Sequence, residues 1–377
     1  MTTSIGGTTG VTFPDLSVQP IAAGSYTMGF KNRIINGAMI IDQKNEGAEI
    51  TPANTDYIVD RWFASLTAAS KYKAGQNAGA VTPPTGFIDY LGATSLSSYT
   101  VGASDSFSLR QSIEGLNMAD LAWGTASAAT ITLSFWVRST GLATYPATFG
   151  ASLKNSGSTR SYPFTYTINT AATWEQKTVT IAGDTTGTWL TTNGVGVTLC
   201  FSLGSGSTYS GTADTWASAN YISVAGAASV VGTSGATFYI TGVQFEKGST
   251  ATSFDVRPYG TELMLCQRYY YKVSASNGIL AESGYATSAT GFRGVTKFPV
   301  TMRTAPTALG QTGTATNYRV IGSGAASTVC STVPVFTNAT ENMAQTTFTV
   351  ASGLTAYSGG TGASSGTTAY LGWDAEL

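Results

Sequence analysis

The stretch FYITGVQFEKGSTATSFDVRPYGTELMLCQRYYYK, Phe238–Lys272, decides the fold because it joins a strand pattern to the one convincing helix pattern in the chain. Its first part alternates with a period of two, as a strand with one face in a core does. The residues on one side of this alternation are Tyr239, Thr241, Val243 and Phe245. The sequence on either side also has β patterning, so we expect two β modules linked by a short helix.

The linking helix is expected directly after Pro258. Thr261 can cap its start, and Glu262 suits the positive end of the helix dipole. Further along, residues recur at helical spacing at Leu263, Cys266 and Tyr270. We therefore assign the linking helix to residues 258–271.

Short strand-like segments lie on both sides of this helix. Between residues 105 and 245 they recur at regular spacing, separated by Gly, Asn, Asp and Ser clusters, which is typical of a β-sandwich. In ITLSFWVRS the expected core face consists of Ile131, Leu133, Phe135 and Val137. Further strands are expected at Ile34–Gln43, Tyr57–Ser65 and, bracketed by prolines, Val300–Arg303. We expect a sandwich at 26–257 and a smaller β-rich C-terminal domain at 272–377.

The composition agrees with an all-β fold. Charged residues make up 10% of the chain, against roughly 25% in an average soluble domain, and hydrophobic residues make up 42%. Few charges and many β-branched or aromatic residues favour strands, and the 44 glycines suit tight turns. The net charge of −1, without a long run of one sign, argues against a nucleic-acid partner.

The sequence gives evidence on membrane insertion, secretion and disulfide bonds. No apolar stretch reaches membrane-spanning length, and the N-terminal MTTSIGGTTGVTFPD lacks the features of a secretory signal, so we expect no membrane insertion. The three cysteines are isolated and odd in number, which argues against a disulfide framework. We expect buried free thiols at Cys200, Cys266 and Cys330.

The sequence contains few of the residue combinations that enzymes use for catalysis. The chain contains no histidine, which excludes Ser-His-Asp and Cys-His catalysis and imidazole-based zinc sites. A glycosidase needs only two carboxylates, and the candidates are Asp105, Glu114, Asp120, Glu175, Asp184 and Asp214. Because no pair stands out among them, we expect no catalytic residues, no enzyme activity and no cofactor. A structural calcium ion stays an open alternative, since clustered oxygen ligands cannot be located in a sequence.

Four motifs stand out: NRIING at 32–37, DRW at 60–62, LAWGTASAATITLSFWVRS at 121–139 and GVQFEKGSTATSFDVRPYGTELMLCQRYY at 242–270. In order and spacing they resemble a module of phage and prophage virion proteins. KFPVTMRTAP at 297–306 and LGWDAEL at 371–377 resemble the C-terminal part of the same family. In addition, GVTFPDLSVQ at 10–19 resembles a short element of phage fibre and appendage proteins.

The resemblance implies a jelly-roll β-sandwich of the carbohydrate-binding-module kind, preceded by an extended anchoring arm at 1–25. It further implies a structural virion protein of a tailed phage, assembled in the host cytoplasm: a tail fibre or adhesin that contacts host surface glycans. Its partners would be other virion proteins, bound through the arm, and further copies of itself in a homotrimer. The main alternative is a head or collar decoration or fibre protein with a purely structural role, and a glycan hydrolase is a distant third.

A candidate sugar site lies in the loop region Thr188–Tyr221. Sugar binding needs aromatic rings together with amide or hydroxyl groups in a shallow groove. The residues of these types are Trp189, Asn193, Tyr209, Asp214, Trp216, Asn220 and Tyr221. The alternative interpretation is that the aromatic residues are core or interface anchors, because large aromatic side chains usually bury their area.

Overall fold

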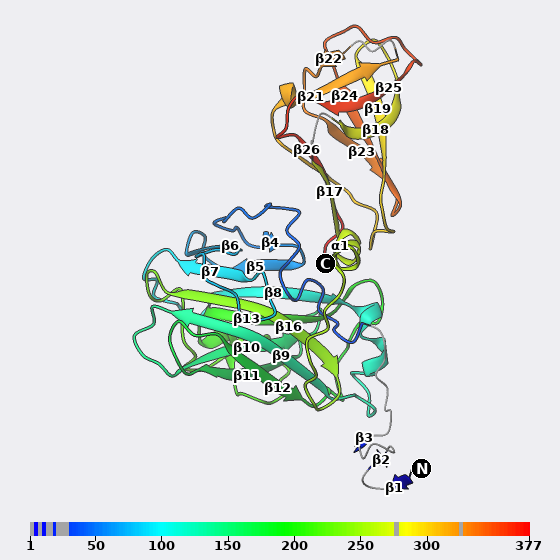
Figure 1. Ribbon diagram of the computed structural model, residues 1–377. Coiled ribbons are helices and arrows are strands. Elements are labelled where there is room, and N and C mark those ends of the chain that lie inside the picture. Colours follow the sequence, from blue (N-terminus) through cyan, green and yellow to red (C-terminus); the bar gives the residue numbers. More distant parts are fainter. Residues whose placement is uncertain (1–3, 7–9, 13–17, 20–29, 275–278, 324–326) are drawn as a thin grey trace.

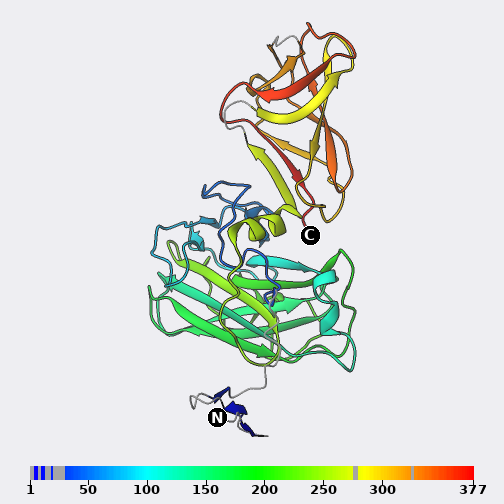
Figure 2. The same cartoon turned by 45° about the vertical axis from the view of Figure 1, so that its right-hand side comes forward.

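The computed structural model describes residues 4–6, 10–12, 18–19, 30–274, 279–323 and 327–377. Within these residues the protein is all-β, as predicted, with a single α-helix, α1 (Tyr259–Gln267). A large sandwich and a smaller β domain lie on opposite sides of α1, and the C-terminus lies beside this helix (Figure 1). A view turned by 45° shows the same two bodies, which meet in the region around α1 (Figure 2).

One layer of the sandwich is a six-stranded sheet with the order β11-β10-β13-β8-β5-β4. In chain order these strands are β4 (Tyr57–Val59), β5 (Trp62–Leu66), β8 (Ser106–Glu114), β10 (Ala147–Lys154), β11 (Ser161–Ile168) and β13 (Val195–Ser205). All of its pairings are antiparallel. The centre of the sheet thus brings β10, β13 and β8 side by side from distant parts of the sequence.

The facing layer is a five-stranded sheet with the order β12-β9-β16-β7-β6. Its strands are β6 (Tyr72–Gln76), β7 (Leu91–Ser95), β9 (Ile131–Thr140), β12 (Glu175–Ile181) and β16 (Thr237–Lys247). The sequence did not predict β6 and β7. Their residues, YKAGQ and LGATS, are poor strand formers, so pairing and burial within the sheet determine their conformation.

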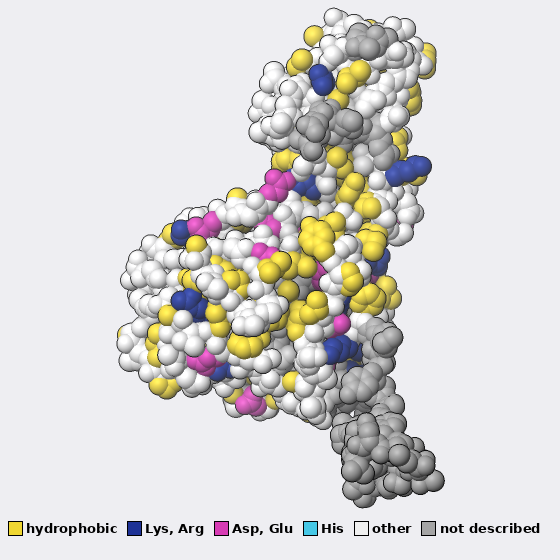
Figure 3. Space-filling model, in the orientation of Figure 1, with side chains coloured by type: hydrophobic (Ala, Val, Ile, Leu, Met, Phe, Trp, Pro, Cys, Tyr) yellow, Lys and Arg dark blue, Asp and Glu magenta, His cyan; other side chains and the backbone are white. Residues whose placement is uncertain are grey.

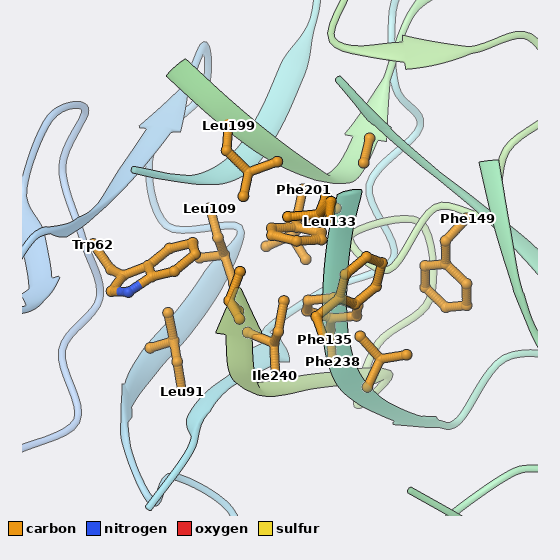
Figure 4. Close-up of a cluster of buried hydrophobic side chains, with 14 of the residues drawn as sticks. Trp62, Leu91, Leu109, Leu133, Phe135, Phe149, Leu199, Phe201, Phe238 and Ile240 are labelled. Carbon is orange, nitrogen blue, oxygen red and sulfur yellow. The ribbon is translucent and has the colours of Figure 1, made fainter. Parts of the chain in front are cut away.

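The inner faces of the two sheets share one hydrophobic core (Figure 4). Aromatic side chains fill its centre; for example, the rings of Phe135 and Phe201 meet edge to face with centroids 5.0 Å apart. The predicted core face of β9 is confirmed, because Ile131, Leu133, Phe135 and Val137 are fully buried. The sandwich therefore has a single core built from inward-facing residues of both layers.

Strand β16 differs from the predicted alternation. Its core residues are Phe238, Ile240, Val243 and Phe245, so the side that faces the core changes midway along the strand. The change occurs because the register with β9 shifts between Thr241 and Gln244, where Gly242 has a φ of +61°. A β-bulge with glycine in the left-handed region adds one residue to the strand. The predicted alternation, which placed Tyr239 and Thr241 on the same side of the strand as Val243, was therefore wrong.

The C-terminal domain contains a three-stranded and a seven-stranded sheet, with the orders β17-β26-β20 and β22-β21-β25-β18-β19-β24-β23. The strands are β17 (Tyr270–Ser274), β18 (Ile279–Ala286), β19 (Gly291–Lys297), β20 (Leu309–Gln311), β21 (Tyr318–Gly322), β22 (Ser327–Val329), β23 (Val335–Ala339), β24 (Met343–Thr349), β25 (Gly359–Ser364) and β26 (Tyr370–Asp374). Their side chains form a separate hydrophobic core around Phe292, Tyr318, Phe348 and Trp373.

The remaining elements are short. They are β1 (Ser4–Gly6), β2 (Gly10–Thr12) and β3 (Val18–Gln19) near the N-terminus, β14 (Ser210–Gly211) and β15 (Ser223–Val224) in the sandwich, and the 3-10 helices η1 (Gly115–Asn117), η2 (Ala119–Leu121), η3 (Ser207–Tyr209) and η4 (Ala315–Asn317). Most of the predicted arm, 1–25, lies outside the described residues. All three cysteines are buried and free, as predicted.

Helix α1 is shorter than the predicted range of 258–271 and begins before the predicted cap residue, Thr261. Pro258, rather than Thr261, occupies the N-cap position, and its carbonyl accepts the first hydrogen bonds of the helix. The helix ends at Gln267, so that Tyr270 is already the first residue of β17. Tyr270 therefore belongs to a strand, although its spacing from Leu263 and Cys266 matches that of a helix.

Two carboxylates at the meeting point of the domains are held by arginines. Arg61, between β4 and β5, forms a buried ion pair with Glu376, and its guanidinium lies 3.6 Å from the ring centre of Tyr269. On β8, Glu114 accepts hydrogen bonds from the Arg268 guanidinium and from the Tyr269 hydroxyl, each 2.6 Å long. Each of these buried charges thus has a partner, which offsets part of the desolvation penalty.

A second set of bonds ties α1 to the start of the sandwich. Asn36 has a left-handed backbone (φ 57°), and its side chain bonds to the backbone of Ile41 and Asp60. The carboxylate of Glu262 on α1 accepts a hydrogen bond from the backbone N–H of Asn36. These side-chain bonds take the place of ladder hydrogen bonds, which is why Ile34–Gln43 is irregular and not the strand that the sequence predicted.

We call these two sets of contacts, together with those of Arg303, the joint. Arg303 donates hydrogen bonds to the carbonyl oxygens of Ala375 and Glu376. Val300–Arg303, predicted as a strand, is therefore an irregular segment of the joint. The joint draws residues from five of the motif segments quoted above: 32–37, 60–62, 242–270, 297–306 and 371–377.

Candidate functional site

The outer face of the six-stranded sheet is polar. The strand register places Ser112, Thr198 and Lys154 in one row across β8, β13 and β10. The adjacent row consists of Arg110, Cys200 and Ser152. Most of these side chains are nevertheless buried, which requires a covering segment.

The cover is the segment 206–224, which carries η3, β14 and β15. Strand β15 packs against β10, β11 and β13. At Gly150 on β10 the approach is so close that a Cβ atom would lie 2.0 Å from the Ser223 hydroxyl oxygen. Glycine at this position therefore allows the cover to lie directly on the sheet.

A groove of about 250 Å³ remains between the cover and the end of β5. Hydroxyl and amide groups line most of it, including those of Ser65, Thr67, Tyr209 and Asn220. Its lining also contains two cations, Arg110 and Lys154. The groove thus combines hydrogen-bonding groups, one aromatic ring and positive charge.

Five of the predicted sugar-site residues lie on the cover: Tyr209, Asp214, Trp216, Asn220 and Tyr221. Tyr209 and Asn220 line the groove itself. Tyr221 packs its ring over Gly211, where a Cβ atom would lie 2.3 Å from a ring carbon. Asp214 is exposed on the cover with a left-handed backbone.

Trp216, on the cover, lies in a cluster with Trp189 and Trp123, and neither Trp216 nor Trp189 lines the groove. The three rings are nearly perpendicular to one another, with centroids 4.9 to 5.4 Å apart. Each indole N–H donates a hydrogen bond to a backbone carbonyl. This geometry favours the alternative interpretation, in which the tryptophans are anchors that pack against the core.

The seventh residue, Asn193, lies at the joint. Its side-chain amide donates to the carbonyl of Arg303, and its own carbonyl accepts from the Arg303 guanidinium. The sequence did not predict Arg110 and Lys154 as site residues. The available signal was the polar side of the alternation in β8, β10 and β13, which becomes one surface only when the strand order is known.

The candidate carboxylates lie outside the groove lining. Glu114 is bound to Arg268 and Tyr269, and Asp184 receives two hydrogen bonds of 2.7 Å from Arg160. Although burial opposes it, these partners hold the pKa of both carboxyl groups below the usual value. The pKa is also lowered for Asp105, Asp120 and Glu175. A glycosidase acid needs a raised pKa instead.

A second hollow, of about 290 Å³, lies beside α1 and is mainly apolar. The rings of Phe87 and Phe254 meet within its wall, and the side chains of Ile88 and Val256 are 77% and 78% exposed at its rim. Apolar side chains gather near the middle of the face of the molecule that Figure 3 shows. The hollow offers apolar contact, whereas the groove offers the polar groups that a sugar needs.

Within the described ranges, no three Asp, Glu or Cys side chains lie close enough together to hold a metal ion. In the same part of the chain, no helix has both the length and the apolar character needed to cross a membrane.

No family model and no curated protein matches the chain. Similar solved structures include the enzymatically active domain of bacteriophage CBA120 tailspike protein 4 (11% identity, 58% of this chain and 22% of that chain, TM-score 0.30). Another is a CBM4, with 15% identity over 56% of this chain and 98% of that chain and a TM-score of 0.29. A third is TmCBM61 in complex with β-1,4-galactotriose, with 11% identity over 50% of this chain and 88% of that chain and a TM-score of 0.27. The match to the tailspike thus spans about a fifth of that chain. At these TM-scores the likenesses carry no argument about function.

Proposed function

We propose that the chain is a non-enzymatic glycan-binding protein and that the groove is its binding surface. The observation that supports this most directly is the lining of hydroxyl and amide groups beside the ring of Tyr209. Sugar hydroxyls need such partners, and an aromatic ring can pack on the apolar face of a sugar. Because the groove is small and polar, the affinity of one site is expected to be roughly micromolar to millimolar.

We further propose that the protein belongs to the virion of a tailed phage, as a tail fibre or adhesin. The motif resemblance supports this, and the joint gives the motifs a physical role, because most of them meet there. The motif resemblance therefore supports the proposed virion role, while the groove supports the proposed glycan ligand. Attachment through the arm at 1–25 and assembly into a homotrimer are parts of the same proposal.

A head or collar protein with a purely structural role is the second candidate. The exposed apolar side chains around the hollow beside α1 favour it, because such patches suit contacts between proteins. The two candidates differ in whether the soluble chain competes with the phage for the host surface.

The test is an adsorption competition with the full chain, together with a glycan array. Wild-type protein should block adsorption and bind glycans, and Tyr209→Ala should lose both activities while remaining folded. Tyr285→Ala, which removes an exposed tyrosine of the C-terminal domain, is the matched control. If Tyr209→Ala competes like wild type, the groove is not the site. If wild type neither binds nor competes, the structural role is the better proposal, and release of reducing ends would indicate a hydrolase.

A further inference from the structure

Two positive charges lie in the lining of the groove, and neither has an acidic partner in the described part of the chain. Lys154 is only 4% exposed, and its ammonium donates a hydrogen bond to the neutral side-chain oxygen of Asn220. Arg110 is partly buried and donates through Nε to the Ser108 hydroxyl. Among the ion pairs of the described residues, none includes Lys154 or Arg110.

Two other arginines, one in the sandwich and one in the joint, do have acidic partners. Arg160 is paired with Asp184 at 2.7 Å, and Arg268 is paired with Glu114 at 2.6 Å. An ammonium that is buried without a counter-ion is costly, since the lost hydration is not replaced by an opposite charge. Lys154 is therefore poorly explained as a structural residue.

The two cations also act on each other. They lie on the same face of the sheet, on strands that flank β13, in adjacent rows of the register. Burial lowers the pKa of Lys154, and the nearby charge of Arg110 lowers it further. An anion bound between them would relieve this repulsion and supply the missing counter-charge.

We propose that the glycan bound in the groove is acidic, with its anionic substituent held by Lys154 and Arg110. This rests on the glycan-binding function proposed above and specifies the class of sugar. A guanidinium matches the planar geometry of a carboxylate, while an ammonium acts as a point charge and also suits a sulfate or phosphate ester. The hydroxyl groups of Ser65 and Tyr209, which also line the groove, can bond to the rest of the sugar.

The attraction is local, because the whole chain has a net charge of −1. Binding of an acidic sugar should therefore weaken as the salt concentration rises through ~0.1 M, where the Debye length is about 10 Å. Binding of a neutral sugar in the same groove should change little with salt.

The first experiment is an array of uronic-acid and sialic-acid oligosaccharides, each printed beside its carboxyl methyl ester, with sulfated sugars printed beside their desulfated forms. The full chain should bind the acidic member of a pair at least about tenfold more tightly, the effect expected of a charge-assisted hydrogen bond. The carboxylate and sulfate pairs show which acid group is preferred.

The second experiment repeats the measurement with variants. Lys154→Gln and Arg110→Gln should each abolish most of the preference for the acid, measured as the ratio of acid to ester affinity, whereas Arg110→Lys should retain part of this preference. Lys297→Gln, at an exposed lysine on β19, is the matched control. Lys154→Gln should keep or raise the midpoint of thermal unfolding, because it removes a buried charge; a purely structural lysine would give a lower midpoint.

The outcomes separate this inference from the proposed function. Equal binding of acids and esters overturns the acidic preference but leaves glycan binding in place. Acid binding that persists in both glutamine variants puts the anion elsewhere and also overturns the inference. If no sugar of any kind binds, both proposals fail.

Discussion

Asp60 is a fully buried carboxyl group in the joint. It accepts hydrogen bonds from the backbone and the side chain of Gln43. Burial raises the pKa of Asp60 from 3.8 to about 6, although the bonds from Gln43 and the charge of Lys44 act in the opposite direction. The folded protein therefore favours the protonated form more strongly than the unfolded chain does.

This raised pKa predicts a specific dependence of stability on pH. A group with a raised folded pKa contributes stability that is fully present below the unfolded value and is lost as the pH rises through the folded value. Compared with Asp60→Asn, wild type should lose up to about 3 kcal/mol of unfolding free energy between pH 3.8 and about 6. Urea unfolding of both proteins across this range measures the difference. A difference that is constant with pH would contradict the assignment.

The tryptophan cluster gives a second prediction at this scale. Trp216→Ala should lower the unfolding free energy by roughly 3 kcal/mol, because the ring packs against Trp123, Trp189 and Tyr162. Glycan binding by the folded variant should be unchanged. Calorimetric unfolding and the glycan array measure the two effects. Lost binding with unchanged stability would instead support the sugar platform expected from the sequence.

At the scale of elements, the bulge in β16 depends on Gly242. A Cβ atom there would lie 2.5 Å from the Phe87 ring, and the backbone is left-handed. Gly242→Ala should therefore lower the unfolding free energy by roughly 1 to 3 kcal/mol. Gly226→Ala is the matched control, because Gly226 has a similar φ of +76° but no atom near the added methyl group. Equal losses in thermal unfolding would show that the ring contact is unimportant.

The same strand shows how far sequence patterns can predict these elements. Alternation located β8, β9 and β13 because apolar side chains mark their core face. It assigned the wrong face to Tyr239 and Thr241, because a bulge leaves no signal in a pattern that assumes a constant period. Side-chain bonds such as those of Asn36 are equally invisible, which explains the mistaken strand at Ile34–Gln43.

The lining of the candidate groove was predictable in part. Residue type was enough to suggest Tyr209 and Asn220, which the structure places in the groove. Lys154 and Arg110 lie more than forty positions apart along the chain, and only the sheet order β10-β13-β8 brings them to one surface. Strand order depends on pairing between distant segments, which local patterns do not encode.

At the scale of the whole molecule, the proposed homotrimer predicts a particle of three times the 38.9 kDa chain mass. Only 10% of the residues in the chain are charged. A surface with so few charges would suit burial between copies of the chain. Light scattering of the full chain at micromolar concentration measures the mass. A stable monomer under these conditions would contradict the proposal.

The burial of all three cysteines has a practical consequence. Burial raises the pKa of Cys266 and of Cys330, the latter to about 11, and Cys200 is fully covered, so thiol reagents should spare the native side chains. Ser158 lines the groove and differs from cysteine by a single atom. A fluorophore attached to Ser158→Cys would therefore label one position in the folded protein, and its emission would report optically on occupancy of the groove.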